Sequence, residues 1–304
     1  MNCAIRCRNC VSTPFAVGND GRNRAQLWAF GAKTERNAPG ASQYVFGPAK
    51  WLRFLITRRQ GTHWCIEITA SKRSGLLRCC LGTSALLQAC ESGDVYLGIA
   101  AQLGFLNEGM NAAERKAVRT LFKTVVLGIQ YGLGYRSLAV RTGLSLSEAA
   151  EILARLRARF SRFEDYGQGV SDHAGLCLEI RTALGWWMQC PSGINPRTVR
   201  NFPIQSTGSE ILHVACILAE RRGIEIVAPV HDAVMAEGPA DQVEELSTAL
   251  DRVLGDAAAI ILRGYRLPTD CQVIRPGERY FDDRGEAMWN TVAGLLARAD
   301  RETA

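Results

Sequence analysis

The run from Arg119 to Gly132 constrains the fold of this 304-residue chain more than any other segment. It reads Arg-Thr-Leu-Phe-Lys-Thr-Val-Val-Leu-Gly-Ile-Gln-Tyr-Gly, with Arg119, Lys123, Leu127 and Tyr131 at intervals of four. On an α-helix, residues four apart lie close to one stripe, drifting by about 40° per step. One helix face would therefore present a guanidinium, an ammonium, an apolar group and a phenol in order.

This order of side chains suits the binding of a nucleoside triphosphate along the helix. Arginine offers a planar fork to phosphate oxygens, whereas lysine offers a mobile point charge. The apolar and phenolic groups would then lie beside the base or the sugar. The spacing alone leaves one alternative open, an amphipathic surface helix with scattered basic residues.

The composition is that of a globular protein with one or two domains, since 47% of the residues are hydrophobic. The net charge is +6, and it is unevenly distributed. Residues 1–60 hold ten Lys or Arg against two acids. A basic N-terminal region of this kind favours contact with nucleic acid, with a solvated basic tail as the alternative.

Eleven cysteines raise the question of disulfides. The first fifteen residues lack the apolar core of a secretory signal, so we predict reduced thiols in a cytoplasmic protein. No run of 18 apolar residues predicts a membrane span. Cys3, Cys7 and Cys10 are close enough for a zinc site, but a fourth ligand is not evident.

Hydrophobic periodicity and turn residues predict an α+β chain. Ser145, three positions before Glu148, predicts a capping box at the start of a helix. The predicted strands are 64–68, 224–230, 233–236 and 268–274, with a hairpin over 177–189 around Gly185. The predicted helices are a segment ending near Glu91, another after Asp94, and 112–131, 146–163, 197–221 and 240–260.

A second motif, Val-His-Asp-Ala-Val, runs from Val230 to Val234 between two apolar half-strands. A strand-turn-strand arrangement would place Asp232 at the tip of a hairpin. Two-metal phosphoryl transfer needs a carboxylate in such a place, because the metals stabilise both the attacking and the leaving oxygen. A simple capped turn is the alternative for this dipeptide alone.

A third motif places Arg197, Asn201 and Gln205 at intervals of four near the start of a helix. The arginine can hold a phosphate, whereas the two amides can reach acceptors in a minor groove. Minor-groove readout is degenerate, which suits an enzyme that copies any sequence. An exposed polar helix face is the alternative.

Together these motifs resemble those of family A DNA polymerases, whose fingers helix follows Arg-x3-Lys-x3-(Phe/Tyr)-Gly-x2-Tyr-Gly. This chain matches that pattern except at Leu127, and it is most similar to a phage-like or prophage-like branch. The resemblance implies an α+β polymerase palm, an antiparallel sheet with packed helices, that carries an inserted helical fingers subdomain. The implied divisions are an irregular segment (1–16), the first part of the palm (17–70), the fingers (71–176) and the remaining palm (177–304).

The resemblance also implies transfer of a dNTP to a primer 3′-hydroxyl with two Mg²⁺ ions. The partners would be primed DNA and dNTPs. The implied dNTP-binding residues are Arg119, Lys123, Leu127, Tyr131 and Gly132. The implied template-primer residues are Arg36, Asn37, Arg197, Asn201 and Gln205. The implied catalytic turn is His231 and Asp232, with Asp232 as a metal ligand.

The first palm motif of the family is disrupted in this chain. No aspartate occurs between Asp20 and Asp94, so Glu67 is the candidate for the second metal ligand. Two explanations are open: compensating frameshifts around residues 67–83, and divergence in which Glu67 replaces the aspartate. The family usually carries a thumb and an exonuclease-like module before the palm, so we expect either a truncated polymerase that lacks them or a partner that supplies them. A catalytically inactive DNA-binding remnant and a single-subunit RNA polymerase stay open as alternative functions.

Overall fold

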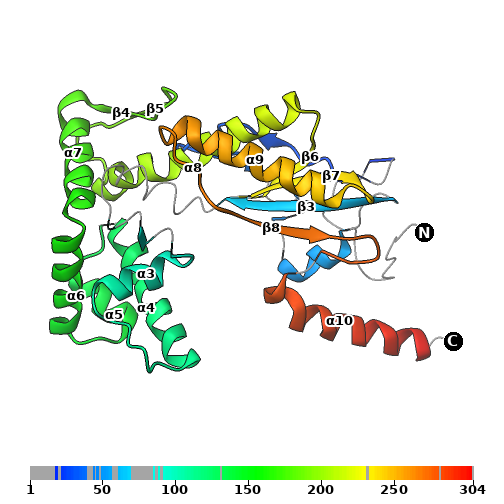
Figure 1. Cartoon of the computed structure of the whole chain (residues 1–304), viewed down its shortest axis with the longest axis horizontal. Coiled ribbons are helices and arrows are strands. Elements are labelled where there is room, and N and C mark those ends of the chain that lie inside the picture. The colour runs from blue at the N-terminus through cyan, green and yellow to red at the C-terminus, as the bar shows by residue number, and fades with distance from the viewer. Residues whose placement is uncertain are drawn as a thin grey trace.

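The computed structural model describes residues 18–19, 22–39, 44, 46–47, 49–56, 61–69, 85, 88–89, 92–130, 132–230, 233–280 and 282–302. Within these ranges the fold is mixed α+β, as predicted. Figure 1 shows a sheet with its helices on one side of the molecule and a group of helices on the other. One buried hydrophobic cluster contains residues of both parts, such as Phe122 and Leu254, so they share a core.

The central sheet has four antiparallel strands. Their order across the sheet is β6 (Glu225–Val230), β7 (Ala233–Pro239), β3 (Thr62–Thr69) and β8 (Thr269–Ile274). Residues on β3 alternate between two buried faces: Cys65 belongs to the larger core, whereas Trp64 and Ile66 belong to a second cluster. A strand covered on both faces reads as a nearly continuous apolar run, and this run made the strand predictable.

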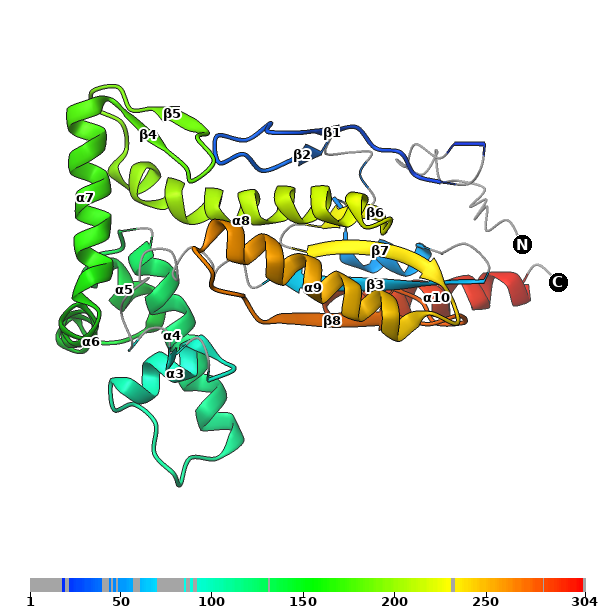
Figure 2. The same cartoon turned by 45° about the horizontal axis from the view of Figure 1, so that its top comes forward.

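Two long helices pack on this sheet. Helix α9 (Val243–Ile261) lies over β3, β7 and β8, and α8 (Pro196–Arg221) packs against α9 and β6. Figure 2 shows α8 extending from the sheet toward the group of helices. The opposite face of the sheet buries the second cluster, with Tyr44, Phe46 and Tyr280.

The helical group consists of five helices in the described residues between 95 and 177. They are α3 (Val95–Gln102), α4 (Ala112–Gln130), α5 (Tyr135–Thr142), α6 (Leu146–Arg159) and α7 (Ser161–Cys177). The predicted capping box at Ser145 is confirmed, because the Ser145 hydroxyl and the Glu148 carboxylate each accept the other's backbone N–H.

The prediction of a single helix over 146–163 is wrong. Helix α6 ends at Arg159, and Phe160, with a ψ of 45°, separates it from α7. Phe160 and Phe163 are both buried in the larger core. The turn thus lets both aromatic rings enter that core while the chain changes direction into α7.

Two short hairpins lie beside α8. The predicted hairpin is confirmed as β4 (Glu179–Arg181) and β5 (Trp187–Gln189), which enclose Gly185 at a φ of +93°. The hairpin of β1 (Leu27–Trp28) and β2 (Ala38–Pro39) lies along α8 in Figure 2. Its Phe30 ring stacks on Trp186 at 5.4 Å and meets His213 of α8 edge-on at 4.7 Å.

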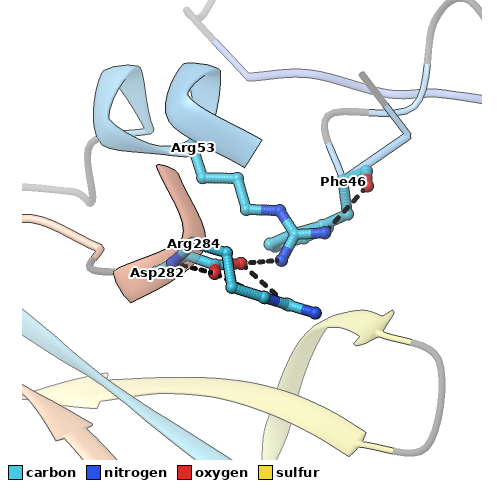
Figure 3. A network of polar contacts seen from close by, with 4 residues as sticks. All are labelled: Phe46, Arg53, Asp282 and Arg284. Carbon is cyan, nitrogen blue, oxygen red and sulfur yellow. Dashed lines mark hydrogen bonds and ion pairs between the residues drawn. The ribbon is translucent and has the colours of Figure 1, made fainter. Parts of the chain in front are cut away.

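The C-terminal helix α10 (Asp283–Glu302) and the 3-10 helix η1 (Lys50–Leu55) were not predicted, and they pack against each other. Figure 3 shows the buried polar network at this joint. Arg53 donates to Asp282 at 2.6 Å and to the Phe46 carbonyl at 3.1 Å, and Arg284 donates to Asp282 at 2.8 Å. The joint therefore depends on an ion pair between residues far apart in the sequence.

In the described part of the chain, no helix is long and apolar enough to cross a membrane. Five described cysteines are free thiols: Cys65, Cys177, Cys190, Cys216 and Cys271. Cys3, Cys7 and Cys10 lie outside the described residues, as do residues 70–84 of the disrupted motif.

Candidate functional site

Helix α4 carries the predicted phosphate-binding face. Arg119 and Lys123 are exposed and Leu127 is half-buried. The opposite face buries Phe122 and Val125 completely in the core. The amphipathic pattern thus orients the two cations away from the core, while Tyr131 lies outside the described residues.

Arg119 is held by two residues at the start of α3. Its Nε–H donates to Oδ2 of Asp94, and its guanidinium lies over the Tyr96 ring, 5.6 Å from the centroid. Burial raises the pKa of Asp94, but the hydrogen bond and charge of Arg119 and two backbone N–H donors outweigh it. The pKa of Asp94 is therefore held below its ordinary value, and the residue is an anion at neutral pH.

The C-terminal end of α4 is a Schellman motif, and it explains both glycines of the run. The Gly132 N–H donates to the Ile129 carbonyl and the Leu133 N–H to the Gly128 carbonyl, both at 2.8 Å. Gly132 has a φ of +67°, which favours glycine. A Cβ on Gly128 would lie 2.7 Å from Cδ2 of Leu133, so this position also favours glycine.

The end of α4 meets the start of α8. A Cβ on Gly132 would lie 3.5 Å from Cγ of Arg197. Helix α8 begins there because the Asn195 side chain caps the Arg197 N–H at 3.0 Å and Pro196 occupies the first turn. Along α8, Arg197 is exposed, and Asn201 and Gln205 are half-buried. The structure thus brings one predicted dNTP residue against one predicted template-primer residue.

An ion pair braces α8 against α7 close to this meeting point. Arg200 donates to Glu164 at 3.0 Å, and both side chains are only about a fifth to a quarter exposed, at 21% and 24%. A Cβ on Gly167 would lie 2.5 Å from the Arg200 guanidinium. The absence of a side chain at Gly167 therefore lets the arginine cross α7 and reach Glu164.

The predicted catalytic turn lies between two described strands. Val230 of β6 pairs with Ala233 of β7, and Ala233 also pairs with Ile68 of β3. The backbone of Glu67 pairs with Val234, so its position in the register is two residues from Asp232. His231, Asp232 and the side chain of Glu67 lie outside the described residues.

The hairpin of β1 and β2 carries the remaining predicted contacts with DNA. Arg36 is exposed and Asn37 is half-buried. Glu35, beside them, has a φ of 62° and is only 4% exposed. Burial and the nearby Glu210 carboxylate raise the pKa of Glu35 to about 7. Glu210 itself accepts the Leu184 N–H at 2.6 Å, and His213 has a pKa lowered by burial.

A model of the family described as DNA polymerase family A matches residues 80–275. This match covers more than half of the chain. The chain belongs to DNA polymerase family A. Both the α4 run and the α8 motif lie within the matched residues.

Relatives and a solved structure agree with this family A assignment. The chain is 24% identical over 209 residues to DNA polymerase I of Deinococcus radiodurans, covering 64% of this chain and 21% of that protein. It is 28% identical over 162 residues to DNA polymerase I of Aquifex aeolicus, covering 49% of this chain and 28% of the other. The chain therefore matches less than a third of the length of either relative, at 21% and 28%.

The fold of this family A chain matches that of a solved polymerase domain. The POL domain of Pol1 from M. smegmatis, in complex with DNA primer-template and dNTP, superposes with a TM-score of 0.71 at 21% identity. The match covers 85% of this chain and 48% of that one. The predicted fold class, a polymerase palm with packed and inserted helices, is confirmed.

Two residues of this family A chain have environments that the sequence did not reveal. The sequence marked Asp94 only as the residue before a predicted helix, yet its side chain contacts Arg119 directly. Its place before a helix signals an N-cap, but no local pattern signals a partner 25 residues away. No local pattern signalled the burial of Glu35, because a charged residue in a turn is ordinarily exposed.

Proposed function

We propose that this chain is the palm and fingers part of a template-directed DNA polymerase. In this proposal residues 71–176 are the fingers, and residues 17–70 and 177–304 form the palm. The membership in family A supports the reaction class, which is transfer of a dNTP to a primer 3′-hydroxyl. The relatives named above are DNA polymerases, which favours the DNA enzyme over a single-subunit RNA polymerase.

The approach of Gly132 to Arg197 is the observation that carries this proposal. It joins the C-terminal end of the helix that would bind the dNTP to the start of the helix that would bind the template-primer. A nucleotide held along α4 would thus lie next to DNA held along α8. Such proximity is what converts two bound reactants into one reactive complex.

In the proposed site, Arg119 and Lys123 bind the triphosphate, and Leu127, Tyr131 and Gly132 line the insertion site. Leucine at 127 offers apolar contact without a ring face, so selection among nucleotides would rest on other groups. Arg197, Asn201 and Gln205 would hold the template-primer from α8, and Arg36 and Asn37 from the β1–β2 hairpin. Phosphate contacts fix the register of the duplex, whereas amides at the minor groove tolerate any sequence.

We further propose that Asp232 and Glu67 hold divalent metal, with Mg²⁺ as the ion. Oxygen donors of carboxylates are the ligands that Mg²⁺ prefers, so this donor set fits the ion. The register of β3 and β7 supports the pairing, because Glu67 lies two positions from Asp232. When bound, the metal would stabilise negative charge on the attacking and leaving oxygens. His231 would flank the metal-binding carboxylate.

Primer extension on a primed template tests the proposal. The full chain is supplied with dNTPs and Mg²⁺, then Mn²⁺, beside Asp232→Ala and a control, Asp241→Ala, at an exposed position after β7. We expect extension by the chain and by the control, and loss of at least about 100-fold in Asp232→Ala, as for removal of an essential electrostatic group. Extension unaffected by Asp232→Ala would overturn the assignment.

The second candidate function is a catalytically inactive DNA-binding remnant of the same fold. The sequence of β3 favours it, because Glu67 is the only acid in Thr62–Thr69. Binding of primed DNA without extension in either metal would support this candidate. We propose that, under either candidate function, the protein acts in the cytoplasm on a bacterial or phage genome.

A further inference from the structure

We propose that Asp94 is a positioning residue for Arg119. It orients the Arg119 guanidinium so that the edge with the two terminal nitrogens faces the phosphates of a bound dNTP. This inference rests on the proposed function, because it assigns Arg119 to the triphosphate. It adds a residue from a different helix to the nucleotide site. The site would then depend on the packing of α3 against α4 as well as on α4 itself.

The two oxygens of the Asp94 carboxylate accept hydrogen bonds from different parts of the chain. Oδ1 accepts the backbone N–H groups of Tyr96 at 3.0 Å and Leu97 at 3.2 Å, which caps α3. Oδ2 accepts the Nε–H of Arg119. Because the cap fixes the rotamer of Asp94, the second oxygen is presented to Arg119 from a rigid support.

Tyr96 restricts Arg119 from another direction. The guanidinium carbon lies 5.6 Å from the centroid of the Tyr96 ring, a cation–π distance. In the described part of the chain, no hydrogen bond reaches Nη1 or Nη2 of Arg119. The side chain is 45% exposed. The Nε edge is thus occupied, and the fork that matches phosphate oxygens is accessible.

Ordering the Arg119 side chain before the nucleotide binds should increase the affinity of the chain for a dNTP. A free arginine loses rotamer freedom when it binds, and prior ordering removes that cost, which corresponds to roughly 3- to 10-fold in the dissociation constant. The negative charge of Asp94 acts in the opposite direction by weakening the attraction for phosphate. Solvent screens this second effect, because the pair is partly exposed.

The variant Asp94→Asn tests the inference. Asparagine keeps the Oδ1 acceptor and is as good an N-cap as aspartate, but its amide nitrogen cannot accept the Arg119 Nε–H. We would measure the dissociation constant of a dNTP with Mg²⁺ and the full chain on primed DNA. We expect it to rise about 3- to 10-fold, with KM rising and kcat changing less.

The matched control is Glu114→Gln, which removes the same charge from the same group of helices. Glu114 accepts the Asn111 N–H at 2.8 Å, and glutamine preserves such a capping box. Glu114→Gln should leave dNTP affinity unchanged or slightly tighter. Equal weakening in Asp94→Asn and Glu114→Gln would mean that the effect is not specific to Arg119, and would overturn the inference.

A double-mutant cycle with Arg119→Ala completes the test. If Asp94 acts through Arg119, Asp94→Asn should have no further effect on dNTP affinity in the Arg119→Ala background. An equal loss in both backgrounds, or unchanged or tighter binding by Asp94→Asn alone, contradicts the inference while the proposed function stands. A parent chain that binds no dNTP would overturn both.

Discussion

At the scale of single residues, the way α4 ends depends on glycine at two positions. Gly128 leaves room for Leu133, and Gly132 takes a left-handed conformation that closes the Schellman motif. The sequence identified these glycines by resemblance only, whereas the structure gives each a steric reason. Because Gly132 also lies against Arg197, its backbone conformation sets how α4 meets α8.

We predict that Gly132→Ala lowers the free energy of unfolding by about 1 kcal/mol, the cost of the left-handed conformation for an L-residue. The control is Gly169→Ala within α7, where the added Cβ would meet no atom of the described residues within 4 Å apart from the local backbone of its own helix. Alanine there should stabilise the chain by about 0.5–1 kcal/mol, as expected for a helix interior. Urea denaturation measures both, and a Gly132→Ala variant as stable as the parent chain would contradict the prediction.

Glu35 is a residue whose ionisation should oppose folding. Its pKa rises from 4.5 to about 7 in the folded chain because of burial and the neighbouring Glu210. Well below pH 4.5 the carboxyl is protonated in both the folded and the unfolded chain, so its ionisation does not lower the free energy of unfolding. As the pH rises, the unfolded chain ionises first, and the free energy of unfolding falls until the folded carboxyl ionises near pH 7.

We predict that Glu35→Gln raises the free energy of unfolding at pH 8 by up to about 3 kcal/mol and has little effect near pH 4. Glutamine is nearly isosteric, so the backbone strain at this position is unchanged. Urea midpoints from pH 4 to 8 give the profile of each variant. Glu108→Gln, at an exposed position, serves as the control and should keep the parent's profile. Parallel profiles for Glu35→Gln and the parent chain would refute the prediction.

At the scale of elements, local patterns predicted most strands and helices near the site, and long-range packing decided the rest. The apolar run of β3 and the periodicity of α8 were sufficient to place these elements. The break between α6 and α7 was missed, because the pattern continues through Phe160 and only the core shows why the chain turns. The start of α6 was predicted correctly, since a capping box is a local signal.

We predict that Ser145→Ala lowers the free energy of unfolding by about 0.5–2 kcal/mol, the cost of removing an N-cap side chain. The loss should be local, so hydrogen exchange should accelerate most in the first turn of α6. Ser171→Ala is the control, since that hydroxyl donates only within α7, to the Gly167 carbonyl at 3.0 Å. If the two variants lose equal stability, the capping box is not the cause.

At the scale of the whole molecule, the sequence predicted the fold class correctly, and the site residues that it named stay predictions. The contacts that join distant segments were not visible in the sequence. The α4 and α8 motifs follow from spacing, and spacing is visible in a sequence. The joint of η1 and α10 was not visible, because Arg53 and Asp282 are 229 residues apart. The same limit applies to Asp94 and Arg119, whose contact depends on how α3 packs on α4.

The joint of η1 and α10 supplies a prediction about the whole fold (Figure 3). Arg53 and Asp282 are 6% and 7% exposed, whereas Arg284 is 64% exposed. Asp282→Asn removes the charge that compensates buried Arg53, so we expect a loss of about 3–5 kcal/mol in unfolding free energy. Arg284→Ala removes only the exposed partner, and its cost should stay below about 1 kcal/mol.

The pH dependence of this joint should be opposite to that of Glu35. The hydrogen bond from Arg284, opposed by burial and aided by the charges of Arg284 and Arg53, holds the pKa of Asp282 below its ordinary value. Its stabilisation is therefore present above the ordinary aspartate pKa and is lost as the pH falls through the folded value. Urea denaturation at pH 7 and pH 3 should show the penalty of Asp282→Asn shrinking in acid. A penalty that is the same at both pH values, or no larger than that of Arg284→Ala, would mean that the buried ion pair does not hold α10 to η1.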